Sequence, residues 1–192
     1  MTIKERRQLK FDQIHSLATK IVVPSQELKS LTPEQLQKKK DEFWDCLWGW
    51  LLEGWASGLL MVDDLKELPD LINLLNWVYP TGESVSDLFE KNLTDLSGME
   101  RLIESEGNRL YNEGVLKAGE GIAKTKTWRT MGDERVRDLH FYLDGMTIPF
   151  DEAFVTYNGD SALAPGGFSD PSNNANCRCW LEINNGTNRE NK

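Results

Sequence analysis

One long segment with helical periodicity, residues 32–62, constrains the fold of this chain more than any other part. Thr32, Pro33 and Gln35 stand in the order of a capping box with proline at the first helical position, so a helix begins here. From residue 43 onward, apolar side chains recur every three or four positions and form one broad stripe. The chain therefore has to be built around a long amphipathic helix whose apolar face is covered.

Three tryptophans lie on that stripe: Trp44, Trp48 and Trp55. The simpler interpretation is a core helix, because an apolar stripe normally packs inward. The alternative is that part of the stripe binds another protein, because aromatic anchors concentrate binding energy at interfaces. Glycines at positions 49, 54 and 58 weaken the helix but allow a neighbouring element to approach closely. The sequence leaves both interpretations open.

The other segments before residue 98 also have mainly helical patterns. Residues 63–79 indicate a helix that is broken at, or begins at, Pro69, and another helix is expected to end near Asn92. A further helix is expected over roughly residues 98–118, and it leads into a segment of different character. We therefore expect a mainly helical N-terminal region over residues 1–97.

From residue 124 the pattern is typical of a small α+β module. The segment TKTWRT has the composition of a strand, and Asp133 is expected to cap a short helix that ends at Gly145. Two short strands around Pro149, a turn-rich surface loop, and a closing strand with Cys177 and Cys179 on one face complete the module. The predicted fold is α+β: a helical region (1–97), a module with its leading helix (98–183), and a polar tail (184–192).

Charge and cysteine usage narrow the functional class. The formal net charge of −9 argues against a protein that wraps nucleic acid, which needs an excess of Lys and Arg. A small basic strip, Lys124, Lys126 and Arg129, is the candidate contact for DNA phosphates. No stretch approaches the roughly 18–20 apolar residues that span a bilayer, so no membrane partner is expected. The charged start and the three cysteines predict a protein made in a reducing cytoplasm.

The NCRC motif at residues 176–179 places two cysteines one residue apart. Together with His140 and Asp133, Cys177 and Cys179 offer the ligand types of a zinc site, although the usual spacing is C-x₂₋₄-C. A disulfide between them would close a strained small ring, and a thiol nucleophile oriented by Asp133 or Asp144 lacks an oxyanion-forming glycine motif. Two thiols buried as small hydrophobes are the preferred interpretation, zinc is the second, and no cofactor is expected.

Arginines of the module are expected to form an internal network with its carboxylates. Arg137 and Arg178 are the candidates for structural pairing, because several aspartates lie close in sequence. Arg135, beside Glu134, is expected to be exposed to solvent. Such a network would hold the short helix, the LDG turn and the last strand together.

An ordered series of motifs runs from ESEGNRLYNEG through KTWRTMGDERVRDLHFYLDGMTIPFDEAF to NCRCW, over roughly residues 100–180. Its distinctive positions are Trp128, Asp133, Arg137, His140, Leu143, Asp144, Gly145, Phe154, Asn176, Cys177, Arg178 and Cys179. In these positions the chain resembles the Mu F-like minor head protein family of tailed bacteriophages.

This resemblance implies a structural protein of the phage head without catalytic turnover. It implies assembly in the host cytoplasm and a place in the virion, at the portal vertex or in the head interior. Its implied partners are the portal protein, the major capsid protein or both, with packaged DNA as a further contact, and some family members are ejected with the genome. The residues alone offer one alternative from another class, a metal-dependent or thiol hydrolase built on His140, Cys177 and Cys179.

Overall fold

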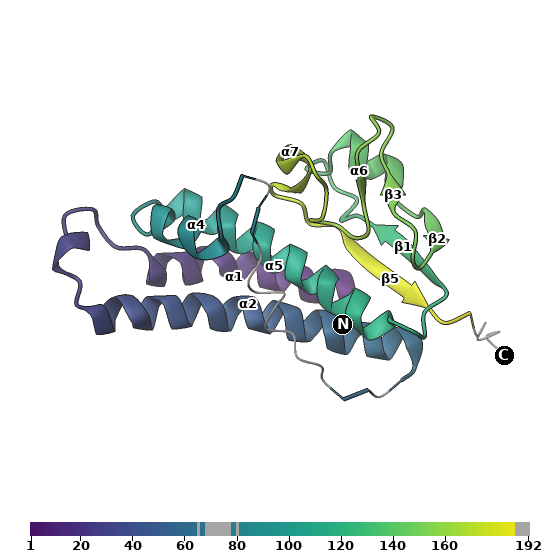
Figure 1. Ribbon diagram of the computed structural model, residues 1–192, viewed down its shortest axis with the longest axis horizontal. Coiled ribbons are helices and arrows are strands. Elements are labelled where there is room, and N and C mark those ends of the chain that lie inside the picture. The colour runs from purple at the N-terminus through teal and green to yellow at the C-terminus, as the bar shows by residue number, and fades with distance from the viewer. Residues whose placement is uncertain (65, 68–77, 80, 187–192) are drawn as a thin grey trace.

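The computed structural model describes residues 1–64, 66–67, 78–79 and 81–186, and the predicted α+β fold is confirmed (Figure 1). A layer of long helices is covered on one side by a small antiparallel sheet with short helices and loops (Figure 1). The helix expected over residues 63–79 falls largely outside the described residues. Within the described part of the chain, no helix combines the length and apolar character needed to cross a membrane.

Local capping signals explain where the long helices begin. These helices are α1 (Ile3–Ile21), α2 (Pro33–Val62), α4 (Val85–Asn92) and α5 (Leu96–Gly119), with a 3₁₀ turn at Leu28–Ser30. Capping boxes at Thr2, Thr32 and Ser84 satisfy first-turn N–H groups of α1, α2 and α4. The predicted start of the long helix at Thr32 and the predicted end near Asn92 are confirmed.

The sheet places its strands in the order β2-β1-β5, with both pairings antiparallel. Its strands are β1 (Thr125–Arg129), β2 (Thr147–Pro149) and β5 (Trp180–Asn184), and Trp128 lies opposite Leu181. A second pair joins β3 (Phe154–Val155) to β4 (Ser161–Ala162), and the short helices are α6 (Asp138–Leu143) and α7 (Pro171–Asn174). Strand β5 packs against α5 and α2, which attaches the sheet to the helical layer.

Three details of the module differ from the sequence-based predictions. Asp133 does not cap the short helix, which begins at Asp138 with Arg137 in the N-cap position. Cys177 and Cys179 precede the last strand, which starts at Trp180. The turn-rich loop is partly buried, because Phe168 packs its ring against Trp128 and His140 inside the module.

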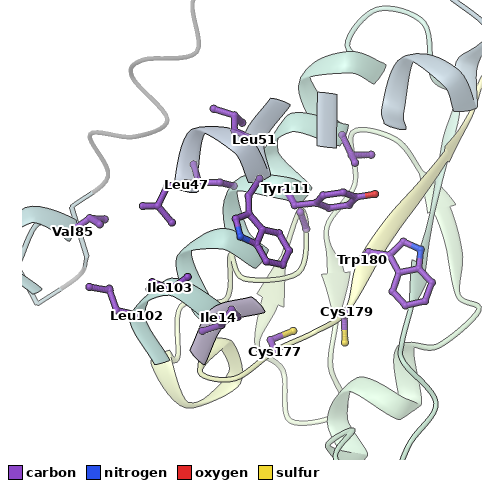
Figure 2. Close-up of a cluster of buried hydrophobic side chains, with 14 of the residues drawn as sticks. Ile14, Leu47, Leu51, Val85, Leu102, Ile103, Tyr111, Cys177, Cys179 and Trp180 are labelled. Atoms are coloured by element: carbon purple, nitrogen blue, oxygen red, sulfur yellow. The ribbon is translucent and has the colours of Figure 1, made fainter. Parts of the chain in front are cut away.

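The apolar core runs through the helices and into the sheet. Its buried side chains include Ile14 of α1, Leu47 of α2, Leu110 of α5, Trp128 of β1 and Ile183 of β5. Figure 2 shows part of this core, including Ile14, Leu47 and Tyr111. A continuous core means that the helical region and the sheet support each other.

The tryptophans of α2 divide between the core and the surface. Trp55 is buried, and so is Trp50, which the periodicity did not place on the apolar stripe. Trp44 and Trp48 are partly buried and pack against the core with one side exposed. The core interpretation thus accounts for Trp55, whose side chain is not free to bind another protein.

Helices α2 and α5 meet at glycines. A Cβ atom at Gly54 would overlap the carbonyl oxygen of Tyr111, and one at Gly114 would overlap the carbonyl oxygen of Leu51. At Gly58, an added Cβ would lie 2.5 Å from the Cβ of Ala118. Gly49 differs, because an added Cβ there meets nothing within 4 Å. Close approach of the backbones is therefore required at Gly54 but not at Gly49.

This difference predicts opposite effects of two similar substitutions. We expect Gly54→Ala to lower the free energy of unfolding by roughly 1–3 kcal/mol, because the backbone of α5 has to move away. Gly49→Ala should raise it by about 0.5–1 kcal/mol, because alanine favours the helix and meets no neighbour. Urea unfolding of both variants measures the difference, and equal destabilisation by both would contradict the packing described for Gly54.

Candidate functional site

A buried asparagine on α5 holds the C-terminal segment in place. The side-chain oxygen of Asn112 accepts a hydrogen bond from the N–H of Leu181 (2.9 Å). Its side-chain nitrogen donates to the carbonyl groups of Cys179 (3.2 Å) and Pro165 (3.3 Å). A single amide therefore satisfies backbone groups on both sides of Trp180 and fixes the position of the NCRC motif relative to α5.

A fully buried arginine from α1 reaches the same segment. Arg7 donates to the side-chain oxygen of Asn108 and to the carbonyl of Cys179 (3.3 Å), and its guanidinium carbon lies 4.3 Å from the Tyr111 ring centre. Burial lowers the pKa of Arg7, although an arginine remains charged at any ordinary pH. Sequence analysis missed this residue, but a signal existed, since Arg7 shares the buried face of α1 with Ile14 and Ala18.

Aromatic residues of the predicted motif meet in one cluster. Trp128 is fully buried, with its ring centre 5.3 Å from that of Phe154 and 5.6 Å from that of His140. Phe168, which sequence analysis did not single out, stacks on the imidazole of His140 at 5.6 Å and 17°. The structure therefore brings together Trp128, His140 and Phe154, and it adds Phe168 from the loop.

The LDG turn binds the end of β1. A side-chain oxygen of Asp144 accepts from the N–H of Thr130 (2.8 Å), and the N–H of Gly145 donates to the carbonyl of Trp128 (2.9 Å). Gly145 has a φ of +78°, in the left-handed region that favours glycine, and Leu143 is fully buried. Asn176 also has a positive φ, +53°, where asparagine is tolerated better than most residues.

The two cysteines of the NCRC motif lie beside His140. Both sulfur atoms are 3.6 Å from the Nδ1 atom of His140, and both thiols are free. The side chains of Cys177 and Cys179 are only 2% and 3% exposed, and His140 is buried too. Figure 2 shows both cysteines on the segment that leads to Trp180, near Tyr111 of α5.

Contacts inside this cluster affect the two thiols in opposite directions. A hydrogen bond with Cys179 holds the pKa of the Cys177 thiol well below its ordinary value, and His140 adds to this effect against the cost of burial. The same contact with Cys177 raises the pKa of Cys179 well above its ordinary value, and burial raises it further. The arrangement therefore favours the loss of one proton from the pair of thiols before the second.

Asp133 belongs to a neighbouring ion pair and not to this cluster. Its carboxylate oxygens accept two hydrogen bonds from the guanidinium of Arg178, at 2.7 and 2.9 Å. The hydrogen bond from Arg178 lowers the pKa of Asp133, against the opposing effect of burial. Among the described residues, the group with metal-ligand spacing contains His140, Cys177 and Cys179, so the prediction of Asp133 as a fourth ligand is wrong.

The arginines of the module have different partners. Arg178 is the buried member of the network, because its side chain is 5% exposed while that of Asp133 is 41% exposed. Arg137 donates to the backbone carbonyl of Ala175, where a carboxylate partner had been expected. Arg135 is exposed, as predicted. These three arginines line a small pocket that also reaches His140 and both cysteines.

The predicted DNA-contact strip is not a continuous basic surface. Lys126 is fully buried, because alternation along β1 puts it on the same face as Trp128, and burial lowers its pKa to about 8. The Nε atom of Arg129 forms an ion pair with the Oε2 atom of Glu182, at 2.8 Å. Of the three basic residues, Lys124 is therefore the exposed one without this kind of partner on the sheet. The prediction of a phosphate contact at Lys126 is therefore wrong.

A comparison with protein families finds one match. The family model described as phage Mu protein F like protein matches residues 80–182, which is more than half of the 192-residue chain. This span includes α4, α5, the strands β1 and β2, the first part of β5 and the His140 cluster. No curated protein and no solved structure matches the chain.

The role of Asn112 leads to a first prediction for this site. We expect Asn112→Ala to lower the free energy of unfolding by roughly 2–4 kcal/mol, because it removes the acceptor for the Leu181 N–H and a donor to the carbonyl groups of Cys179 and Pro165. The control is Asn92→Ala, because the Asn92 amide donates to the carbonyl of Leu88 in its own helix. Urea unfolding tests both variants, and equal losses would show that Asn112 has no special part in holding β5.

A second prediction concerns the arginines around the pocket. Arg178→Ala should lower the free energy of unfolding by about 1–3 kcal/mol, because two hydrogen bonds to a charged partner are lost. The loss should be about 1 kcal/mol for Arg137→Ala and under about 0.5 kcal/mol for Arg135→Ala. Thermal unfolding gives the order of the three variants, and a larger effect of Arg135→Ala than of Arg178→Ala would contradict it.

Proposed function

The chain belongs to the phage Mu protein F like family, and on this basis we propose that it binds the portal protein during assembly of the phage head. Membership makes it a structural protein of bacteriophage head morphogenesis that associates with other head components. The proposed place of action is the portal vertex or the interior of the procapsid, with ejection alongside the genome as a later step. The observation that carries this proposal is the match over residues 80–182, which contains α5 and most of the sheet.

A pair of exposed tyrosines supports a binding surface on the module. Tyr142 of α6 and Tyr157, just after β3, are 53% and 64% exposed, and their rings meet edge to face at 5.8 Å. Tyrosine is enriched at protein interfaces because a large apolar ring is combined with a polar hydroxyl group. We propose that the Tyr142–Tyr157 pair contacts the portal protein. This pair replaces the tryptophan stripe of α2 as the candidate interface, because the stripe is partly covered.

The buried cysteines support a structural role over a thiol hydrolase. A nucleophilic cysteine has to meet its substrate, whereas the side chains of Cys177 and Cys179 are covered by the module. The arginine-lined pocket beside them is small, so a bulky substrate does not fit next to the sulfur atoms. We therefore propose that the family role in assembly requires no catalytic turnover.

Head assembly in the presence and absence of the portal protein tests this proposal. The chain is produced with the major capsid and scaffolding proteins of its phage, and its amount in purified procapsids is measured by immunoblot. We expect incorporation with the portal protein, and a loss of at least about tenfold without it. Equal incorporation in both cases would point to the major capsid protein as the partner and contradict the portal proposal.

The tyrosine pair gives the corresponding variant. The double substitution Tyr142→Ala with Tyr157→Ala should leave thermal unfolding nearly unchanged, because both side chains are exposed, while incorporation falls by about tenfold or more. Leu60→Ala is the matched control, since Leu60 is an exposed apolar residue on α2. Normal incorporation of the double variant would remove the tyrosine pair from the interface.

A further inference from the structure

We propose that His140, Cys177 and Cys179 bind a single zinc ion, with the fourth coordination position facing the arginine-lined pocket. The three residues come from α6 and from the segment before β5, and their ligand atoms all lie within 4.8 Å of one another. Two thiolates and an imidazole are ligands that zinc prefers. The proposal does not depend on the partner of the chain in head assembly.

The two sulfur–nitrogen distances in the cluster fit tetrahedral coordination. Zinc–sulfur and zinc–nitrogen bonds of about 2.3 and 2.0 Å, at a tetrahedral angle, separate the two ligand atoms by about 3.5 Å. Each sulfur atom lies 3.6 Å from the Nδ1 atom of His140. Both sulfur–nitrogen separations therefore match those of a zinc site without movement of the backbone.

Hydrogen bonding alone accounts poorly for this arrangement. The Nδ1 atom of an imidazole has one lone pair, so it accepts from one thiol, yet both thiols face it at the same distance. Among the described residues, the Nε2 atom of His140 has no hydrogen-bond partner, which makes Nδ1 the polar contact on which this buried ring depends. A zinc ion between Nδ1 and the two sulfur atoms would use all three groups at once.

The surrounding residues hold the ligands in place before any ion arrives. The imidazole is stacked on Phe168 and packed edge to face against Trp128. The backbone carbonyl of Cys179 accepts hydrogen bonds from Asn112 and Arg7. The buried positive charge of Arg7 next to this backbone also favours the thiolate form that metal binding needs.

The pocket leaves room for a fourth zinc ligand that does not come from the protein. Asp133 is occupied by Arg178, and the described residues offer no further His, Cys, Asp or Glu ligand within this group. The pocket is lined by His140 and both cysteines together with Arg135, Arg137 and Arg178. A water molecule can complete the coordination there, as it does at zinc sites with three protein ligands.

Metal analysis of the full chain tests the proposal. The protein is purified under reducing conditions, incubated with Zn²⁺ and desalted, and its zinc content is measured. We expect about one equivalent for the wild type, and loss of that equivalent in Cys177→Ser and in Cys179→Ser. Cys46→Ser is the matched control, because Cys46 lies on α2 outside the cluster and its loss should leave the zinc content unchanged.

A second measurement keeps the test valid if a variant fails to fold. Wild-type protein titrated with Co²⁺ should develop thiolate-to-cobalt charge-transfer absorption and the strong visible bands of tetrahedral cobalt, saturating at one equivalent. Zinc should also raise the melting temperature of wild type and Cys46→Ser by about 5–10 °C, and a chelator should reverse this rise. Folded wild-type protein that retains no zinc and gives no thiolate–cobalt absorption would overturn the proposal.

Discussion

The side chain of Asn112 is the contact on which the arrangement of the module depends. Leu181, the residue it fixes through a backbone N–H, is 69 residues away in sequence. Because one amide both donates to Cys179 and accepts from Leu181, β5 can lie beside α5 in one register only. The register of β5 then sets that of β1, and β1 carries Trp128 into the aromatic cluster. The position of the cysteines relative to His140 follows from this chain of contacts.

Arg7 extends the same arrangement to the N-terminal helix. A buried guanidinium is costly, and aromatic rings and hydrogen-bond acceptors reduce that cost. Here the Nη2 atom of Arg7 donates to Asn108 and to the Cys179 carbonyl, and the Tyr111 ring lies against the guanidinium. Movement of α1 away from α5 would remove these contacts with Arg7. The helical region and the sheet are thus coupled by polar contacts as well as by the apolar core.

Part of the candidate site could be predicted from the sequence, and part could not. The motif singled out Trp128, His140 and Phe154, and the structure places Trp128 in contact with both of the others. The partner of each charged residue was harder to predict, because nearness in sequence says little about pairing in a fold. Arg178 binds Asp133 across 45 residues, while Arg137 turns to the carbonyl of Ala175. Several aspartates lie close to Arg137 in sequence, but this did not indicate that its partner is a backbone carbonyl.

The sequence by itself determined the helix starts and the tight turns, because capping boxes and left-handed positions depend on a few neighbouring residues. Thr32 and Gly145 are examples, since each acts within one turn of its own backbone. Only the tertiary structure decided that Arg178 is buried against Asp133 and that two cysteines converge on one imidazole nitrogen. The physical reason is that burial and convergence depend on segments far apart in sequence, which come together only when the helices and the sheet pack.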